Sequence, residues 1–178
     1  GDRRISSTEH DGTVVTLVDN YKGKKFNSPN DLVVKSDDCI WFTDPPYGIL
    51  TNREGHQAES ELGANYVFRM DPSSGELEIV SDDFDRPNGI CFSPDENVMY
   101  IADTGEPGHI RAFDVIDGRR LANSRVFAVV RPGLADGFRV DTNGNLFTSA
   151  KDGIQVYSPE AELLSKILVP EPATANCV

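Results

Sequence analysis

Three oxygen-bearing side chains recur at one position in three similar segments of the sequence. Asn30, Asn88 and Asp136 each follow a short polar start and precede a run of residues that favours a β-strand. If the strands converge on one axis, three oxygen donors meet there. Amide and carboxylate oxygens suit a hard cation such as Ca²⁺ or Mg²⁺. No Cys or His joins the set, which argues against a structural zinc site.

The same residues also favour turns. Asn-Asp, Asn-Gly and Asp-Gly are common turn dipeptides, because short polar side chains and glycine tolerate tight backbone conformations. Recurrence in register favours a shared site, but repeats also inherit turn residues together. The pattern alone therefore leaves a cation site and a set of turns both open.

The segments that carry these residues share one plan. Each has a short polar start, a strand, a turn rich in Asp, Asn or Gly, and a second strand. The three copies are residues 28–44, 86–103 and 134–150. In the third copy the turn contains Asn143-Gly144, a strong signal for a β-hairpin. Repetition of one strand pair predicts a repeat architecture.

Further hairpins are expected between and before these copies. They join residues 4–7 to 13–18, 66–70 to 76–80, 110–115 to 125–129, and 154–157 to 163–169. The repeating unit is thus about four strands in roughly 40–58 residues, the size of one propeller blade.

The sequence therefore predicts an all-β fold with about three to four blades of a β-propeller in this chain. Residues after Pro172, including Asn176, resemble the start of a fourth copy. A propeller must close to cover its terminal blades. We expect residues 1–178 to be a partial propeller domain whose N-terminal and C-terminal blades lie outside this chain. A β-sandwich is the alternative, but it would not place equivalent polar residues at equivalent positions.

Composition excludes some classes of partner. The net charge of −12 argues against nucleic acid and disfavours anionic membranes. No apolar run approaches the ~20 residues of a membrane span. The three cysteines have no C-x-x-C spacing. We interpret them as reduced thiols, which favours a cytoplasmic location and leaves a periplasmic one open.

Several well-known catalytic motifs are absent from the sequence. It has no G-x-S-x-G nucleophile elbow, no H-E-x-x-H, no Walker A loop and no G-x-G-x-x-G. Residues 44–48 (DPPYG) follow a strand and open a long stretch that runs to Gly63. This stretch is either a rigid surface loop or a loop that overhangs the mouth of the site, because long loops are often functional.

At these residues the chain resembles the senescence marker protein/gluconolactonase/luciferin-regenerating enzyme family, and bacterial gluconolactonases most closely. The resemblance covers essentially the whole chain. The motifs that carry it are residues 27–31 (NSPND), 41–48 (WFTDPPYG), 86–90 (RPNGI), 92–96 (FSPDE) and 135–141 (ADGFRVD).

The resemblance implies a six-bladed propeller with one divalent cation on its axis. Ca²⁺ is preferred, with Mg²⁺, Mn²⁺ or Zn²⁺ as alternatives. The two Asn ligands of the family fall on Asn30 and Asn88, and its Asp ligand on Asp136. A family Glu ligand has no match in this chain. Asp31 matches a position expected to contact the hydroxyls of a sugar lactone.

The implied reaction is hydrolysis of a sugar lactone, the ring opening of an aldonolactone to the aldonic acid. Asp136 is the expected catalytic base, because it is the only ionisable member of the ligand set, and Asp31 is expected to orient the substrate. The expected partner is a small sugar lactone. The alternatives are a related propeller enzyme, arylesterase-like or strictosidine-synthase-like, and a non-catalytic calcium-binding propeller.

Overall fold

Three four-stranded antiparallel sheets follow one another along residues 2–177, the part of the chain that the structure, a computed structural model, describes. The first contains β5 (Leu32–Val34), β6 (Ile40–Asp44), β7 (Tyr66–Asp71) and β8 (Glu76–Ser81); the second contains β9 (Pro87–Phe92), β10 (Val98–Asp103), β11 (His109–Ile116) and β12 (Arg120–Ala128); the third contains β13 (Phe138–Val140), β14 (Leu146–Ala150), β15 (Gly153–Tyr157) and β16 (Leu163–Leu168).

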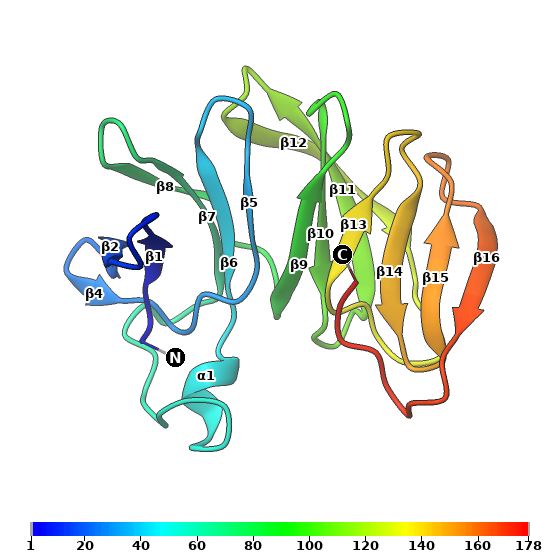
Figure 1. Cartoon of the computed structure of the whole chain (residues 1–178), viewed down its shortest axis with the longest axis horizontal. Helices are drawn as coiled ribbons and strands as arrows, with labels where there is room; N and C mark the ends of the chain where they lie inside the picture. The colour runs from blue at the N-terminus through cyan, green and yellow to red at the C-terminus, as the bar shows by residue number, and fades with distance from the viewer. Residues whose placement is uncertain (1, 178) are drawn as a thin grey trace.

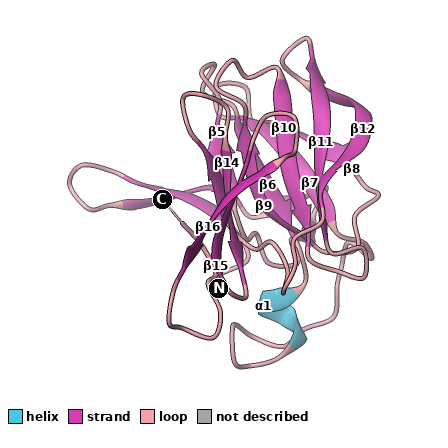
Figure 2. Cartoon of the chain, turned by 90° about the vertical axis from the view of Figure 1, so that its right-hand side faces the viewer, coloured by secondary structure: helices cyan, strands magenta, loops and turns pink. Residues whose placement is uncertain are grey.

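Two short hairpins and a single helical turn complete the regular structure of the described residues. The hairpins are β1 (Ile5–Thr8) with β2 (Val14–Val18), and β3 (Asn20–Tyr21) with β4 (Lys24–Lys25). The helix α1 (Tyr47–Leu50) lies beyond the strand ends of its sheet (Figures 1 and 2). No helix among residues 2–177 has the length and apolar character to cross a membrane.

Each four-stranded sheet is a meander in which every strand pairs with the next one in the chain. The sheets stand side by side like the blades of a fan (Figure 1). Their first strands are neighbours, since β9 contacts both β5 and β13. This arrangement is that of propeller blades, whose first strands line the axis. The predicted all-β, partial-propeller fold is confirmed.

Apolar side chains fill the spaces between the sheets, because successive residues of a strand point to opposite faces. On β10, Met99 and Ile101 pack toward the first sheet, whereas Tyr100 and Ala102 pack toward the third. Trp41 of β6 joins Met99 in one cluster while its neighbour Phe42 joins another. Because both faces of a blade are buried, its strands carry apolar residues at consecutive positions rather than only at every second one.

The predicted hairpins are confirmed to within one residue at most boundaries, and β12 is the exception. It begins at Arg120, five residues before the predicted start at Arg125, because the pairing of Ile116 with Arg120 extends the hairpin up to its turn. Residues 120–124 (RLANS) are poor in β-branched residues, so their propensity does not reveal the strand. All three cysteines are free in the described part of the chain.

Candidate functional site

The three predicted cation ligands lie where the first strand of each sheet begins. Asn30 and Asp136 stand two residues before β5 and β13, as predicted, whereas Asn88 is the second residue of β9 rather than its predecessor. The N–H of Asn30 donates to the carbonyl oxygen of Thr43 at 2.9 Å. The N–H of Asp136 donates to the hydroxyl of Ser149 at 2.9 Å. In both cases the second strand of the sheet fixes the backbone of the site residue.

Hydrogen bonds between sheets bring the three residues to one axis. The hydroxyl of Thr43 donates to the carbonyl oxygen of Asn88 at 2.8 Å. The N–H of Gly89 donates to the carbonyl oxygen of Asp136 at 2.9 Å. A Cβ at Gly89 would lie 2.2 Å from the Asp136 oxygen, so only glycine permits this approach. Asn88 and Asp136 are therefore each tied to the preceding sheet.

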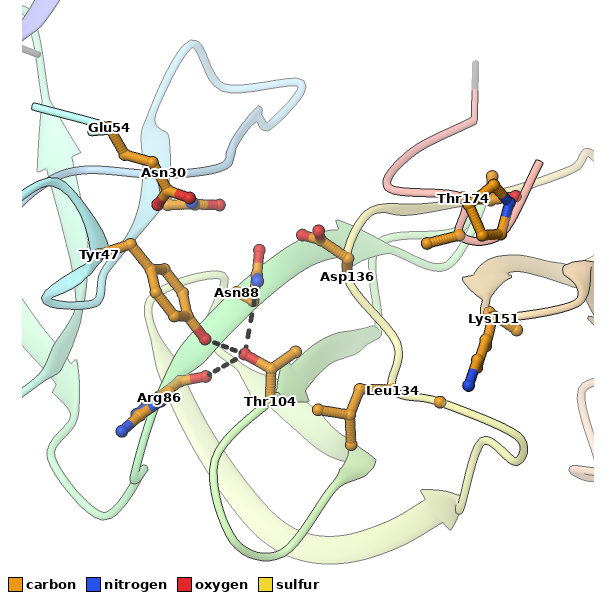
Figure 3. A pocket seen from close by; sticks show the side chains of 14 residues that line it. Asn30, Tyr47, Glu54, Arg86, Asn88, Thr104, Leu134, Asp136, Lys151 and Thr174 are labelled. Carbon is orange, nitrogen blue, oxygen red and sulfur yellow. Dashed lines mark hydrogen bonds between the residues drawn. The ribbon is translucent and has the colours of Figure 1, made fainter.

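A pocket of about 620 Å³ opens at this axis, and all three predicted residues line it (Figure 3). Asn88 is 5% exposed, whereas Asn30 is exposed. Six further polar residues share the lining: Tyr47, Glu54, Arg86, Thr104, Lys151 and Thr174. The structure thus brings together the side chains that the repeats place at one position.

The side-chain oxygen of Asn88 is the most informative atom of the pocket. Its Oδ1 is buried and has no hydrogen-bond partner among the residues that the structure describes. Its Nδ2 lies 3.4 Å from the hydroxyl oxygen of Thr104. A buried acceptor left without a partner costs about 1–3 kcal/mol. An electropositive group in the pocket would remove that cost by binding to Oδ1 of Asn88.

The donor set around this atom fits a hard divalent cation. Asn30, Asn88 and Asp136 offer two amides and one carboxylate, which are ligands that Ca²⁺ and Mg²⁺ accept. Across residues 2–177, no group of three or more His, Cys, Asp or Glu side chains could hold a metal ion. A cation in this pocket would therefore depend on the amide oxygens.

Asp136 is held in a setting that makes its ionised form costly. Burial raises the pKa of its carboxyl group, and the negative charges of Asp31 and Glu54 raise the pKa further, while the Asn88 amide lowers it. A positive charge in the pocket would lower this pKa again, because it stabilises the ionised carboxylate. The side chain is chemically suited to bind a cation and to accept a proton.

Asp31 is not among the residues that line the pocket. Its carboxylate accepts hydrogen bonds from the N–H of Leu32 at 2.9 Å and from that of Ile90 at 3.2 Å. An oxygen of the same carboxylate lies 3.5 Å from Nη1 of Arg139. These contacts connect β5 to β9, and the predicted contact of Asp31 with a substrate hydroxyl stays a prediction.

The repeats contain a signal for two of the additional pocket residues. Thr104 and Lys151 each stand directly after the second strand of their copy, β10 and β14. Tyr47 and Glu54 belong to the long stretch after β6, and no repeat marks them. Their place in the lining favours the interpretation that this stretch overhangs the site.

Two buried carboxylates hold the chain that leads into the first strands. Asp44 accepts hydrogen bonds from the N–H groups of Asn27 and Ser28 at 2.8 and 2.7 Å. Asp103 accepts equivalent bonds from Asp85 and Arg86 at 3.0 and 2.9 Å. Burial raises the pKa of Asp44 to about 7, against the lowering effect of the two N–H donors and of the charge of Arg3.

Comparison with protein families gives a match over nearly the whole chain. The SMP-30/Gluconolactonase/LRE-like region matches residues 2–178. The gluconolactonase of Zymomonas mobilis is 39% identical over 171 residues, which cover 90% of this chain and 47% of that protein. The chain spans about half the length of the curated relatives it matches.

Solved structures agree with this match. The gluconolactonase of Xanthomonas campestris superimposes with a TM-score of 0.95 at 42% identity, over 100% of this chain and 59% of that one. Regucalcin of Agrobacterium tumefaciens, described as a calcium-binding protein, superimposes with a TM-score of 0.75 at 19% identity. That alignment covers 98% of this chain and 57% of regucalcin, and it supports the fold alone.

Proposed function

Because the chain belongs to the SMP-30/gluconolactonase/LRE-like family, we propose that the complete protein is a metal-dependent sugar lactone hydrolase. It opens the ring of an aldonolactone with water and releases the aldonic acid. The observation that carries the proposal is the buried, unpartnered Oδ1 of Asn88 in a pocket shared with Asn30 and Asp136.

In this proposal Asn30, Asn88 and Asp136 hold one divalent cation, with Ca²⁺ as the preferred ion. The oxygen chemistry of the three side chains supports a hard cation. When bound, the cation would polarise the lactone carbonyl and stabilise the negative charge that develops on its oxygen.

Asp136 is the proposed general base. Its carboxylate removes a proton from the attacking water, whose oxygen forms a bond to the lactone carbonyl carbon. The bond between that carbon and the ring oxygen then breaks, and the proton passes to the released hydroxyl group. Asp136 suits the role because it is the carboxylate of the ligand set and lines the same pocket.

The remaining polar residues of the pocket are proposed to bind the sugar ring. A volume of about 620 Å³ suits a small ligand of this kind. Tyr47, Glu54 and Lys151 offer donors and acceptors to hydroxyl groups from several directions (Figure 3). Their mixture of charges favours a neutral, polyhydroxylated substrate over an apolar ester.

The test is acid release from glucono-1,5-lactone by the complete protein, measured at constant pH before and after chelation. We expect chelation to abolish turnover and a divalent cation to restore it. Asp136→Asn should lower kcat by about 10²-fold or more, since it removes the base and a charged ligand. Asp82→Asn, an exposed position outside the pocket lining, is the matched control. Near-normal turnover of Asp136→Asn would remove Asp136 as the base.

A further inference from the structure

The hydroxyl group of Thr104 connects Asn88 to two other residues of the pocket (Figure 3). Its Oγ1 lies 3.4 Å from Nδ2 of Asn88 and 3.3 Å from the carbonyl oxygen of Arg86. The phenol of Tyr47 is hydrogen-bonded to the same Oγ1. The N–H of Thr104 also donates to the Arg86 carbonyl at 3.0 Å, which holds the residue in place.

The chemistry of these neighbours assigns the direction of each hydrogen bond. The Arg86 carbonyl can only accept, so Thr104 donates its one hydroxyl proton to it. Tyr47 then donates its phenol proton to Thr104, and the NH₂ group of Asn88 donates to the remaining acceptor position. Thr104 Oγ1 is therefore an acceptor for Asn88.

This assignment fixes which end of the Asn88 amide faces the pocket. An amide can turn by half a rotation and exchange its oxygen with its NH₂ group. With the NH₂ group on Thr104, Oδ1 is directed away from it and stays unpartnered. The turned amide would present an N–H donor in place of Oδ1, and an N–H group cannot bind a cation.

We propose that Thr104, supported by Tyr47, is a positioning residue that orients the Asn88 amide for cation binding. The proposal rests on the proposed function, because it takes Asn88 as a ligand of the cation. It assigns a role to two residues outside the predicted ligand set. Neither of them needs to touch the ion or the substrate in this role.

The first test measures Ca²⁺ affinity by calorimetry on the metal-free complete protein. Thr104→Val keeps the side-chain shape but removes the acceptor, and we expect the Kd to rise about five- to tenfold, as for loss of one buried hydrogen bond. Thr104→Ser retains the hydroxyl and should stay within about twofold of the parent. Tyr47→Phe removes the supporting donor and should weaken binding by about two- to threefold.

The second test asks whether the effect depends on amide orientation. A carboxylate has an oxygen at both ends, so Asn88→Asp needs no partner to choose between them. In an Asn88→Asp background we expect Thr104→Val to change the Kd by less than about twofold. An equal loss in both backgrounds would overturn the proposal, because Thr104 would then act on the site by another route.

Two readouts separate this inference from its alternatives. A merely structural role of Thr104 would lower the unfolding temperature of the metal-free protein and leave the Kd unchanged, and that result overturns the proposal. If the unsubstituted protein binds neither Ca²⁺ nor Mn²⁺, the metal dependence in the proposed function fails and the inference fails with it. If it binds Ca²⁺ and Thr104→Val binds equally well, the inference alone fails.

Discussion

The N–H of Gly89 donates a 2.9 Å hydrogen bond to the carbonyl oxygen of Asp136, and this bond joins two blades where both present a side chain to the pocket. A Cβ on residue 89 would lie 2.2 Å from that oxygen. The spacing of the blades at the axis therefore depends on the absence of a side chain.

Gly89→Ala should accordingly destabilise the protein by about 1–3 kcal/mol, because overpacking forces the backbone apart. The same displacement should weaken Ca²⁺ binding, which calorimetry can measure. Gly12→Ala is the control: no atom lies within 4 Å of its added Cβ, so it should cost stability through its positive φ and leave the Kd unchanged. Equal Kd values for both variants would contradict the role of the Gly89 contact.

The raised pKa of Asp44 predicts that the stability of the protein depends on pH. Burial raises the pKa of Asp44 to about 7 from 3.8, so between these values the folded state binds more protons than the unfolded state. The contribution of Asp44 to the free energy of unfolding is then greatest below about pH 4, and it falls as the pH rises toward 7. Asp44→Asn removes the titration, so the stability of the parent relative to this variant should decline over that range. Denaturant unfolding at several pH values measures it, and a pH-independent difference would contradict the prediction.

Asp31→Asn separates a structural role from contact with the substrate. The carboxylate links Leu32, Ile90 and Arg139, and it is absent from the pocket lining. We expect a lower unfolding temperature and a KM for gluconolactone within about twofold of the parent. A large rise in KM without loss of stability would instead favour the direct contact with a sugar hydroxyl that the family resemblance implies.

Glu54 is expected to attract the cation without being one of the predicted ligands. Glu54 and Asp136 line the same pocket, and the negative charge of Glu54 raises the pKa of Asp136. Glu54→Gln should weaken Ca²⁺ binding by a few-fold at low salt and by less at high salt, where charges are screened. Glu160→Gln, an exposed change outside the pocket lining, should have no effect in the same titration. A salt-independent loss would argue for a direct bond to the ion.

The sequence predicted the blades and the grouping of Asn30, Asn88 and Asp136 because both follow from repetition. It could not predict that Tyr47 and Glu54 line the pocket, since their loop occurs once and reaches the pocket only through the fold. It also placed the start of the fourth copy at Asn176. In the structure the N–H of Gly137 donates to the carbonyl oxygen of Ala175, just as the N–H of Gly89 donates to that of Asp136. By this hydrogen bond, Ala175 is the residue equivalent to Asp136.

The role of Thr104 could not be predicted from the sequence for a different reason. Its position after the second strand is visible in the repeat, but its use as an acceptor depends on where Arg86 and Tyr47 direct their polar groups. Hydrogen-bond direction is a property of the folded site. The same holds for Asp31, whose partners on β9 and β13 are distant in sequence.

The most direct test of the account is an anomalous difference map from crystals of the complete protein soaked in Mn²⁺. We expect one dominant peak in the axial pocket, within bonding distance of the side-chain oxygens of Asn30, Asn88 and Asp136. A dominant peak elsewhere, or a peak in the pocket without contact to Asn88 Oδ1 and Asp136, would contradict it.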